Sequence, residues 1–266
     1  MRLLLAFSIL STLPAFSAVD CTERDLQGPY GFLLSGVTTI SGTEAPVAGL
    51  ARIEFDGHSS ISGYSSVNFN GLLLGNPVTG TYKVNNDCTV SLSLQDDSGA
   101  FQNFSGTLNQ AGNRLSVRQT DRGTGERGLI AKSSNACATG SFRGQYSFTL
   151  SGAFTPLAEA GASGNISAKG LVEADGTGKF TLNRSFEREG NRVSVAAPGT
   201  FDVESDCIIR LEFTLPAIDG GAEIPLKLRG VLVNDGKEIL AIETSPQETL
   251  SVQLVNIKSV SQAPEI

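Results

Sequence analysis

Histidine and tryptophan are nearly missing from this sequence of 266 residues, which has one histidine and no tryptophan. A single histidine cannot supply the paired imidazoles of the usual zinc site, and a serine triad would have to use His58. No G-x-S-x-G nucleophile motif occurs. We therefore assign no catalytic residue, no metal site and no cofactor. Because His58 directly follows an Asp-Gly pair, we expect it to lie in an exposed turn.

Charge is also scarce, since charged residues make up 18% of the chain against roughly a quarter in typical soluble proteins. The balance is acidic, with a formal net charge of −7. A nucleic-acid partner needs a basic surface, and so does electrostatic docking on anionic membranes. The composition therefore argues against both kinds of partner.

Long apolar runs are confined to the N-terminus. Arg2 precedes an apolar stretch that ends at Pro14, and small residues follow. This pattern is typical of a secretory signal peptide, which we place at residues 1–18, and the stretch is too short to span a membrane. Asp20 precedes Cys21 where a lipoprotein signal needs a small residue. The pattern predicts a secreted or periplasmic protein with no lipid anchor and no membrane span.

Only four cysteines occur, and each belongs to a pattern that appears twice. Cys21 and Cys137 each precede a G-x-Y-x-F-x-x-x-G motif, while Cys88 and Cys207 each end a G-T-[YF]-x-V-x-x-D-C motif. Export permits disulfides, and four cysteines allow three pairings. The duplication selects Cys21–Cys88 and Cys137–Cys207, one per repeat. A zinc site made by all four thiols is disfavoured because no C-x-x-C occurs.

Apolar residues alternate with a period of two rather than 3.6, most clearly over 114–118 and 249–254. Asn-Gly and Asp-Gly pairs, which suit tight hairpins, separate such runs. Closing an antiparallel meander into a barrel removes its exposed edges. We therefore predict an all-β fold of two tandem eight-stranded antiparallel meander barrels, with one disulfide each. The predicted strands are 30–38, 47–56, 60–69, 79–86, 88–95, 101–109, 113–121 and 126–133, then 145–153, 165–175, 178–189, 199–205, 207–215, 223–234, 237–246 and 249–258.

The segment between the repeats is short. Residues 133–136 form the natural linker, so we expect the first barrel over 19–134, the second over 135–260 and a tail over 261–266. Two units joined this closely should touch each other. A single merged sixteen-stranded barrel is the alternative, and the separate disulfides argue against it.

The duplicated motifs also resemble those of a known group. On these motifs the chain is similar to uncharacterised secreted bacterial two-repeat β-barrel proteins of calycin-like or allene-oxide-cyclase-like type. The resemblance covers both repeats and implies a barrel that binds an apolar ligand or cyclises a reactive intermediate. The residues that carry it are Gly28, Tyr30, Phe32, Gly36, Gly80, Tyr82, Asp87 and Cys88, with Gly144, Tyr146, Phe148, Gly152, Gly199, Phe201, Asp206 and Cys207.

Aromatic residues supply the candidate ligand contacts. An eight-stranded barrel is either filled by its own side chains or holds one small ligand. We interpret the protein as a non-catalytic barrel protein that binds a small apolar or amphipathic ligand. A cyclase-like or isomerase-like barrel enzyme and a structural cell-surface module are the alternatives. The expected lining residues are Tyr30, Phe32, Tyr82, Phe104, Tyr146, Phe148, Phe201 and Phe213.

Arginines gather in one stretch of the first repeat. Arg114 and Arg118 share the strand face opposite Leu115, and Arg122 and Arg127 follow closely. A solvated outer face is the simpler interpretation, and a site for a carboxylate or a sugar acid is the alternative. The second repeat keeps little of this cluster, so a function specific to the first barrel is conceivable.

Two aspartates precede a cysteine, Asp87 before Cys88 and Asp206 before Cys207. At a strand end, such a side chain commonly accepts hydrogen bonds from neighbouring backbone amides. Calcium ligation is the alternative, although no known calcium-binding motif accompanies either residue.

Overall fold

The structure is a computed structural model that describes residues 20–40, 43–69, 71–97, 99, 101–109, 111–122, 125–154, 164–188, 191–215, 223–245 and 248–260. The predicted signal peptide and C-terminal tail lie outside the described residues.

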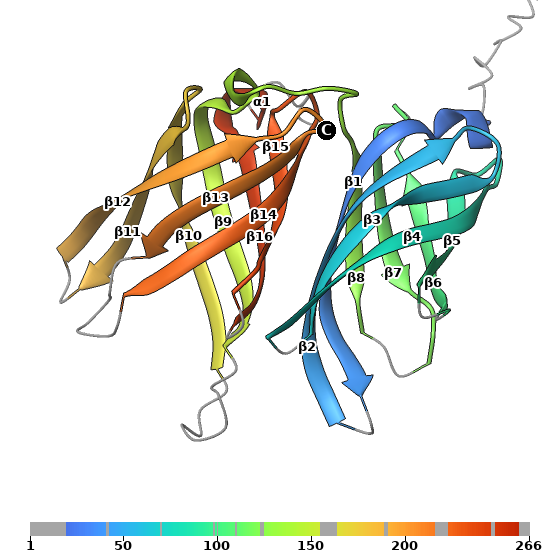
Figure 1. Ribbon diagram of the computed structural model, residues 1–266, viewed down its shortest axis with the longest axis horizontal. Coiled ribbons are helices and arrows are strands. Elements are labelled where there is room, and N and C mark those ends of the chain that lie inside the picture. The colour runs from blue at the N-terminus through green and yellow to red at the C-terminus, as the bar shows by residue number, and fades with distance from the viewer. Residues whose placement is uncertain are drawn as a thin grey trace, which may run out of the picture.

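Two closed eight-stranded antiparallel barrels stand side by side, as the alternation predicts (Figure 1). In each barrel the strands follow one another as a meander, and the last strand pairs with the first. The first barrel comprises β1 (Gln27–Ile40), β2 (Thr43–Asp56), β3 (Ser60–Phe69), β4 (Leu72–Val84), β5 (Thr89–Asp96), β6 (Phe101–Leu108), β7 (Arg114–Gln119) and β8 (Arg127–Lys132). The second comprises β9 (Arg143–Phe154), β10 (Gly164–Asp175), β11 (Lys179–Arg188), β12 (Asn191–Val203), β13 (Ile208–Leu215), β14 (Ile224–Val233), β15 (Glu238–Glu243) and β16 (Glu248–Asn256), followed by the short helix α1 (Ile257–Val260).

The fourth strand of each barrel is longer than predicted. β4 begins at Leu72 and β12 at Asn191, well before the expected starts at 79 and 199. Each missed stretch contains a proline, Pro77 or Pro198, and proline usually argues against a central strand. Both prolines lie just before the residues that pair with the following strand, so the missing N–H is tolerated there.

A short segment closes one end of each barrel. In the first barrel a 3-10 turn (Glu23–Asp25) leads to Leu26, which is fully buried. The Tyr82 hydroxyl donates to the carbonyls of Glu23 and Leu26 at 3.1 and 3.0 Å. In the second barrel the turn Thr139–Ser141 leads in the same way to the buried Phe142. We refer to the opposite end of each barrel, where no such segment is seen among the described residues, as its open end.

Both predicted disulfides are confirmed, Cys21 with Cys88 and Cys137 with Cys207. Each one ties the closing segment to the hairpin between the fourth and fifth strands. The predicted role of the preceding aspartates is confirmed as well. The Asp87 carboxylate accepts the Thr89 amide at 3.0 Å, and in the second barrel Ile208 donates in the same way to Asp206 at 3.2 Å.

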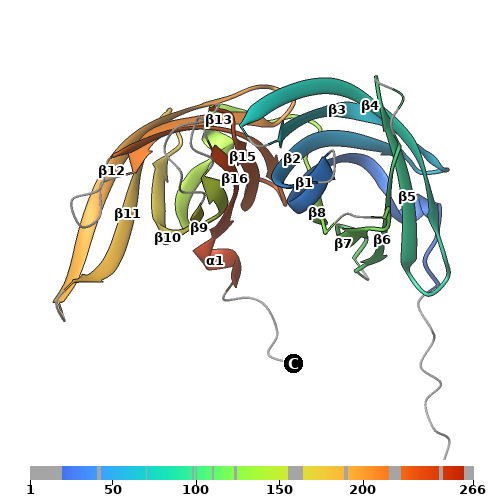
Figure 2. The same cartoon turned by 90° about the horizontal axis from the view of Figure 1, so that it is seen from below.

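The barrels pack together through the outer faces of β1, β2 and β8 on one side and of β13 to β16 on the other (Figures 1 and 2). β15 is buried on both faces, because one face lines the second barrel and the other meets the first. This explains why its sequence is an almost continuous apolar run. The buried side chains of this interface are Ala48, Leu50, Ala131, Ile208, Val231, Val233, Leu240 and Ile242.

Polar contacts fix the relative position of the barrels. Arg114 of β7 makes two hydrogen bonds to the buried Glu238 of β15, at 2.7 and 3.2 Å. The buried Asn68 side chain donates to the Glu248 carbonyl at 2.8 Å. In the predicted linker, the Ser133 hydroxyl donates to a carbonyl of β14 at 2.7 Å. The linker is therefore part of the interface.

Candidate ligand cavity in the first barrel

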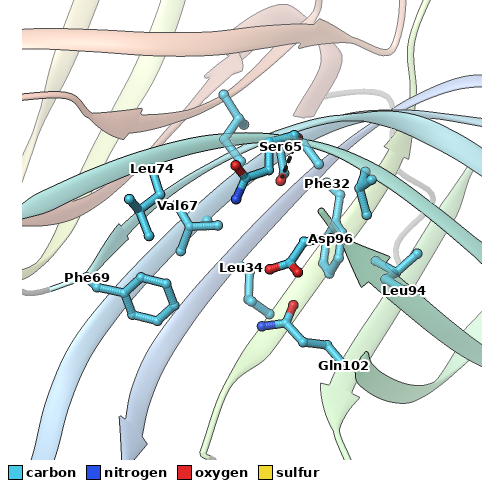
Figure 3. Close-up of a pocket in the computed structure, with 14 residues that line it drawn as sticks. Phe32, Leu34, Ser65, Val67, Phe69, Leu74, Leu94, Asp96 and Gln102 are labelled. Atoms are coloured by element: carbon cyan, nitrogen blue, oxygen red, sulfur yellow. Dashed lines mark hydrogen bonds between the residues drawn. The ribbon is translucent and has the colours of Figure 1, made fainter. Parts of the chain in front are cut away.

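A cavity of about 90 Å³ lies inside the open end of the first barrel (Figure 3). Alternation along the strands places every second side chain inside the barrel, so all of its strands except β7 and β8 contribute to the cavity. The lining is mainly apolar, and it consists of Phe32, Leu34, Gly49, Leu50, Ala51, Ser65, Val67, Phe69, Leu74, Asn76, Val78, Leu94, Asp96 and Gln102.

Four polar side chains interrupt this apolar wall: Ser65, Asn76, Asp96 and Gln102. Figure 3 shows the Asp96 carboxylate and the Gln102 amide close together beside Leu34. The Ser65 hydroxyl donates to the Asn76 carbonyl across the β3–β4 pair at 3.2 Å. The cavity therefore combines an apolar surface with hydrogen-bonding groups from β3 to β6.

The same positions are different in the second barrel. The motifs that end in Cys88 and Cys207 place Asn76 and Asp96 in register with Val195 and Leu215. The strand register matches the remaining two. Ser65 pairs with Asn76, and in the second barrel Arg184 pairs with Val195, so Ser65 matches Arg184. Gln102 pairs with Leu94, and Leu226 pairs with Phe213, so Gln102 matches Leu226. Three of the four polar positions are thus aliphatic in the second barrel.

Apolar side chains occupy most of the matching positions in the described part of the second barrel. Leu215 and Leu226 are each buried to about 98% or more. Phe213 stands where the first barrel has Leu94, and its ring lies 6.0 Å from Phe148 and 5.6 Å from Phe180. At these described positions the second barrel therefore has larger side chains than the first.

A buried carboxyl lies at the same open end of the first barrel. Glu126 is 2% exposed, and it precedes β8 on the inward-facing side, opposite Gly36. Its Oε2 has no hydrogen-bond partner. Burial raises the pKa of Glu126, and repulsion from Asp121 adds to this, while a hydrogen bond with Thr38 opposes it. The open end of this barrel therefore contains a buried polar group, Glu126, in addition to the polar residues that line the cavity.

An apolar rim surrounds the opening. Among the described residues, most of the large hydrophobic side chains left exposed belong to strand ends at this end of the first barrel. Leu72 and Phe101 are the most exposed, each at 61%. The others at this end are Val37, Leu73 and Leu74. Exposed apolar groups around a cavity mouth are typical of a binding surface.

The aromatic residues expected to line a ligand site are all buried inside the barrels. Only Phe32 among them borders the cavity. The others pack against one another, as Tyr82 does against Phe55 at 4.9 Å and Phe148 against Phe213. Their part in ligand binding stays a prediction, and their structural part is to fill the cores.

The arginine cluster is divided in the structure. Arg114 is engaged by Glu238 across the interface. Arg118 and Arg127 lie opposite each other on the outer face of β7 and β8, and Arg122 is exposed in the hairpin between them. These three could still meet an anion without Arg114, and that role stays a prediction. His58 is exposed as expected, in a turn whose Asp56 carboxylate accepts the His58 amide at 2.8 Å.

The described ranges contain no group of three or more histidine, cysteine or acidic residues that could hold a metal ion. No helix within them is long and apolar enough to cross a membrane. Comparison with known proteins adds no relative, since no protein-family model matches the chain and no curated protein matches it significantly. The likeness to calycin-like barrels therefore stays a prediction, and two closed barrels with one disulfide each are what is shown.

Sequence reasoning missed the polar cavity residues Ser65, Asn76, Asp96 and Gln102, and the buried Glu126 at the same end of the barrel. It concentrated on what the repeats share, whereas these residues differ between the repeats. The signal was present in the aligned sequences, because Asn76 and Asp96 align with Val195 and Leu215. An inward-facing position that is polar in one copy and aliphatic in the other marks a place where the copies have diverged in function or in packing.

Proposed function

We propose that this is a secreted or periplasmic, non-catalytic binding protein whose first barrel holds a small amphipathic molecule. The second barrel serves as a packed scaffold that supports the first. The observation that carries the proposal is the difference between the two interiors. The first has a cavity with four polar side chains, whereas three of the four matching positions in the second are aliphatic. Two disulfides support an oxidising compartment outside the cytoplasm.

The size of the cavity constrains the ligand. Pockets for drug-sized ligands usually measure about 300–1,000 Å³, and this cavity measures about 90 Å³. Only an apolar end of the ligand can therefore be enclosed against Leu34, Val67 and Phe69. Its polar group would meet Asp96 and Gln102, and the remainder would lie against the apolar rim. A flexible chain or a small ring with one hydrogen-bonding group fits this description.

Native mass spectrometry of protein purified from its own host tests the proposal. We expect a population with one extra small molecule per chain, at a single stoichiometry. The double variant Asp96→Leu with Gln102→Leu installs the residues of the second barrel and should remove this population, because it fills the cavity and deletes its polar groups. The control is Thr81→Leu with Ser91→Leu, which adds the same apolar residues at exposed positions of β4 and β5.

Either of two results would overturn the proposal. One is a wild-type protein that carries nothing and binds no member of an amphipathic panel of fatty acids, fatty alcohols and alkylamines. The other is a ligand that survives the double variant but is lost in the exposed control.

A cyclase-like or isomerase-like enzyme is the second candidate, and the convergence of Asp96, Gln102 and the buried Glu126 at one end of the barrel favours it. Such an enzyme would convert the bound molecule to an isomer of equal mass. Chromatography of the recovered ligand after incubation with excess protein distinguishes the two functions. A new isomer that Glu126→Gln abolishes supports the enzyme, and an unchanged ligand supports the binding protein.

A further inference from the structure

A cleft between the two barrels lies on the outer face of β2 and β3, the strands that also form part of the cavity wall. Along β2 and β3, inward residues such as Ala51 and Ser65 line the cavity, while their neighbours Arg52 and Tyr64 point outward. The outward residues border a cleft of about 190 Å³ between the two barrels. The second barrel contributes Arg229 of β14 to the same cleft. The two sites therefore share a wall but open on opposite faces of it.

Two guanidinium groups converge in this cleft. Arg52 lies directly across from Tyr64 in the β2–β3 register, and the Arg229 guanidinium lies over the same tyrosine ring, 5.8 Å from its centroid. The Arg52 Nε is shielded from solvent and has no hydrogen-bond partner. A cation–π contact leaves the hydrogen-bonding edge of a guanidinium available for an acceptor.

One carboxylate borders the cleft, but it does not neutralise these arginines. The Asp206 carboxylate accepts the backbone amide of Ile208 at 3.2 Å. In the described part of the chain, no ion pair joins Asp206 to Arg52 or Arg229. In a protein of net charge −7, two half-buried arginines beside one tyrosine, with no acidic partner among the described residues, are unusual.

Apolar side chains also border the cleft. Leu50 and Ile208 come from the interface between the barrels, and the Tyr64 ring lies beside them. An engineered apolar cavity of about 150 Å³ in another protein accommodates benzene, so a single ring fits a cleft of about 190 Å³. Ser66 adds a hydroxyl among these groups.

We propose that the cleft between the barrels binds a small organic anion, with its carboxylate or phosphate held by Arg52 and Arg229. Guanidinium groups bind both head groups through paired hydrogen bonds. The apolar part of the anion lies against Leu50, Ile208 and Tyr64. This site lies outside the first barrel and does not depend on the ligand proposed for the cavity.

Isothermal titration and NMR of the full chain, with four probes of known chemistry, test the site. Phenyl phosphate and benzoate present the two head groups on the same ring, inorganic phosphate lacks the ring, and benzylamine reverses the charge. We expect phenyl phosphate or benzoate to bind one per chain and to shift the Tyr64 ring signals. Inorganic phosphate should bind more weakly, and benzylamine should not bind. The tighter of the two ring anions identifies the head group.

Substitutions assign the arginines. Arg52→Gln and Arg229→Gln should each weaken binding by about tenfold or more, because each removes charge-assisted hydrogen bonds. Arg52→Lys keeps the charge without the planar fork and should recover part of the affinity. Arg210→Gln is the matched control, because Arg210 pairs with Arg229 across β13 and β14 but is held by Glu204 outside the cleft. It should bind as the wild type does.

The site is refuted if neither ring anion binds at concentrations up to about 10 mM, which corresponds to roughly −3 kcal/mol. Equal weakening in Arg210→Gln and Arg52→Gln would also refute it, because the effect would then come from net charge alone. Anion binding should persist in Asp96→Leu with Gln102→Leu, so the two sites can fail independently.

Discussion

The two barrels build the same three-ring cluster at their closed ends from different positions. Tyr30 and Tyr82 of the first barrel correspond to Tyr146 and Phe201 of the second. Between the first pair lies Phe55 of β2, at ring distances of 5.1 and 4.9 Å. Between the second pair lies a phenylalanine from the closing segment, at 4.8 and 4.9 Å. Each copy thus places one ring in the same space.

The exchange is reciprocal. Phe55 aligns with Ala174, and Phe142 aligns with Leu26, so each barrel has one large and one smaller side chain at this pair of positions. Each barrel therefore keeps three packed rings although the positions that supply them differ. The open ends show the opposite behaviour. There the second barrel has large apolar side chains at described positions where the first barrel has polar groups and a cavity. At the closed ends, a ring missing at one position is thus supplied from another position. At the open ends, the differences between the two barrels are not offset in this way, and this is where the candidate site lies.

Exchanging one pair of aligned residues at the open ends should give the largest effect. Leu215→Asp would bury a carboxylate without a partner at a site that is 2% exposed, and it should lower the free energy of unfolding by about 3–5 kcal/mol. Asp96→Leu, the reverse change in the first barrel, should alter it by less than about 1 kcal/mol, because the cavity accepts the side chain. Urea denaturation measures both changes.

The exposed neighbour Thr214 supplies the control, because Thr214→Asp introduces the same charge on the outer face of the same strand. That variant should stay within about 0.5 kcal/mol of the wild type. If Asp96→Leu cost as much as Leu215→Asp, the two open ends would be equivalent and the contrast between them would be lost.

The ring exchange at the closed ends gives the next prediction. Phe55→Ala alone should cost about 3–5 kcal/mol, because it leaves a cavity between two rings. Adding Leu26→Phe supplies the ring from the closing segment, as the second barrel does, and should recover at least about half of the loss. Thermal or urea unfolding of the two single variants and the double variant gives the coupling. Strict additivity would show that the two arrangements are not interchangeable.

Much of this architecture could be predicted from the sequence because a period of two, hairpin turns and a duplicated cysteine frame are local signals. They gave both barrels and both disulfides. The first halves of β4 and β12 were not predicted, because each contains a proline and proline usually argues against a strand. The barrel tolerates these prolines because pairing with the next strand begins only after them.

The candidate site was less predictable because it depends on tertiary placement. Whether Asp96 lies inside a barrel follows from strand register, and whether a space remains around it depends on residues from six strands. The cleft between the barrels could not be predicted from the sequence for a further reason. Arg52 and Arg229 are 177 positions apart in the sequence, and only the packing of one barrel against the other brings them together.

Buried carboxyl groups at the open ends of both barrels should make the free energy of unfolding depend on pH, and the contribution of each barrel can be compared. Burial raises the pKa of Glu248 in the second barrel to about 7, and repulsion from Glu243 adds to the shift. Burial also raises the pKa of Glu243, against hydrogen bonds from the Ser245 and Lys227 amides, and that of Glu126 in the first barrel. A raised carboxyl pKa means that the folded protein binds more protons than the unfolded chain between the unfolded pKa and the folded one.

The free energy of unfolding should therefore fall as pH rises from about 4.5 to about 7, by up to about 3 kcal/mol from Glu248. Glu248→Gln should remove most of this slope, whereas Glu126→Gln should remove a smaller part. Urea titrations at several pH values measure it. A slope that Glu126→Gln abolishes and Glu248→Gln leaves unchanged would place the dominant buried acid in the first barrel instead.

The smallest expected effect concerns the contact that holds the unequal barrels together. Arg114 is partly exposed while its partner Glu238 is buried, and Glu238 also accepts the Asn234 and Gln253 side-chain amides. Arg114→Met should therefore lower the free energy of unfolding by only about 1 kcal/mol, because Glu238 keeps two donors. Arg210→Met, which removes an exposed ion pair within the second barrel, should change it by less than about 0.5 kcal/mol. Equal losses in urea denaturation would mean that the interface pair contributes no more than a surface pair, and that apolar contact alone joins the two barrels.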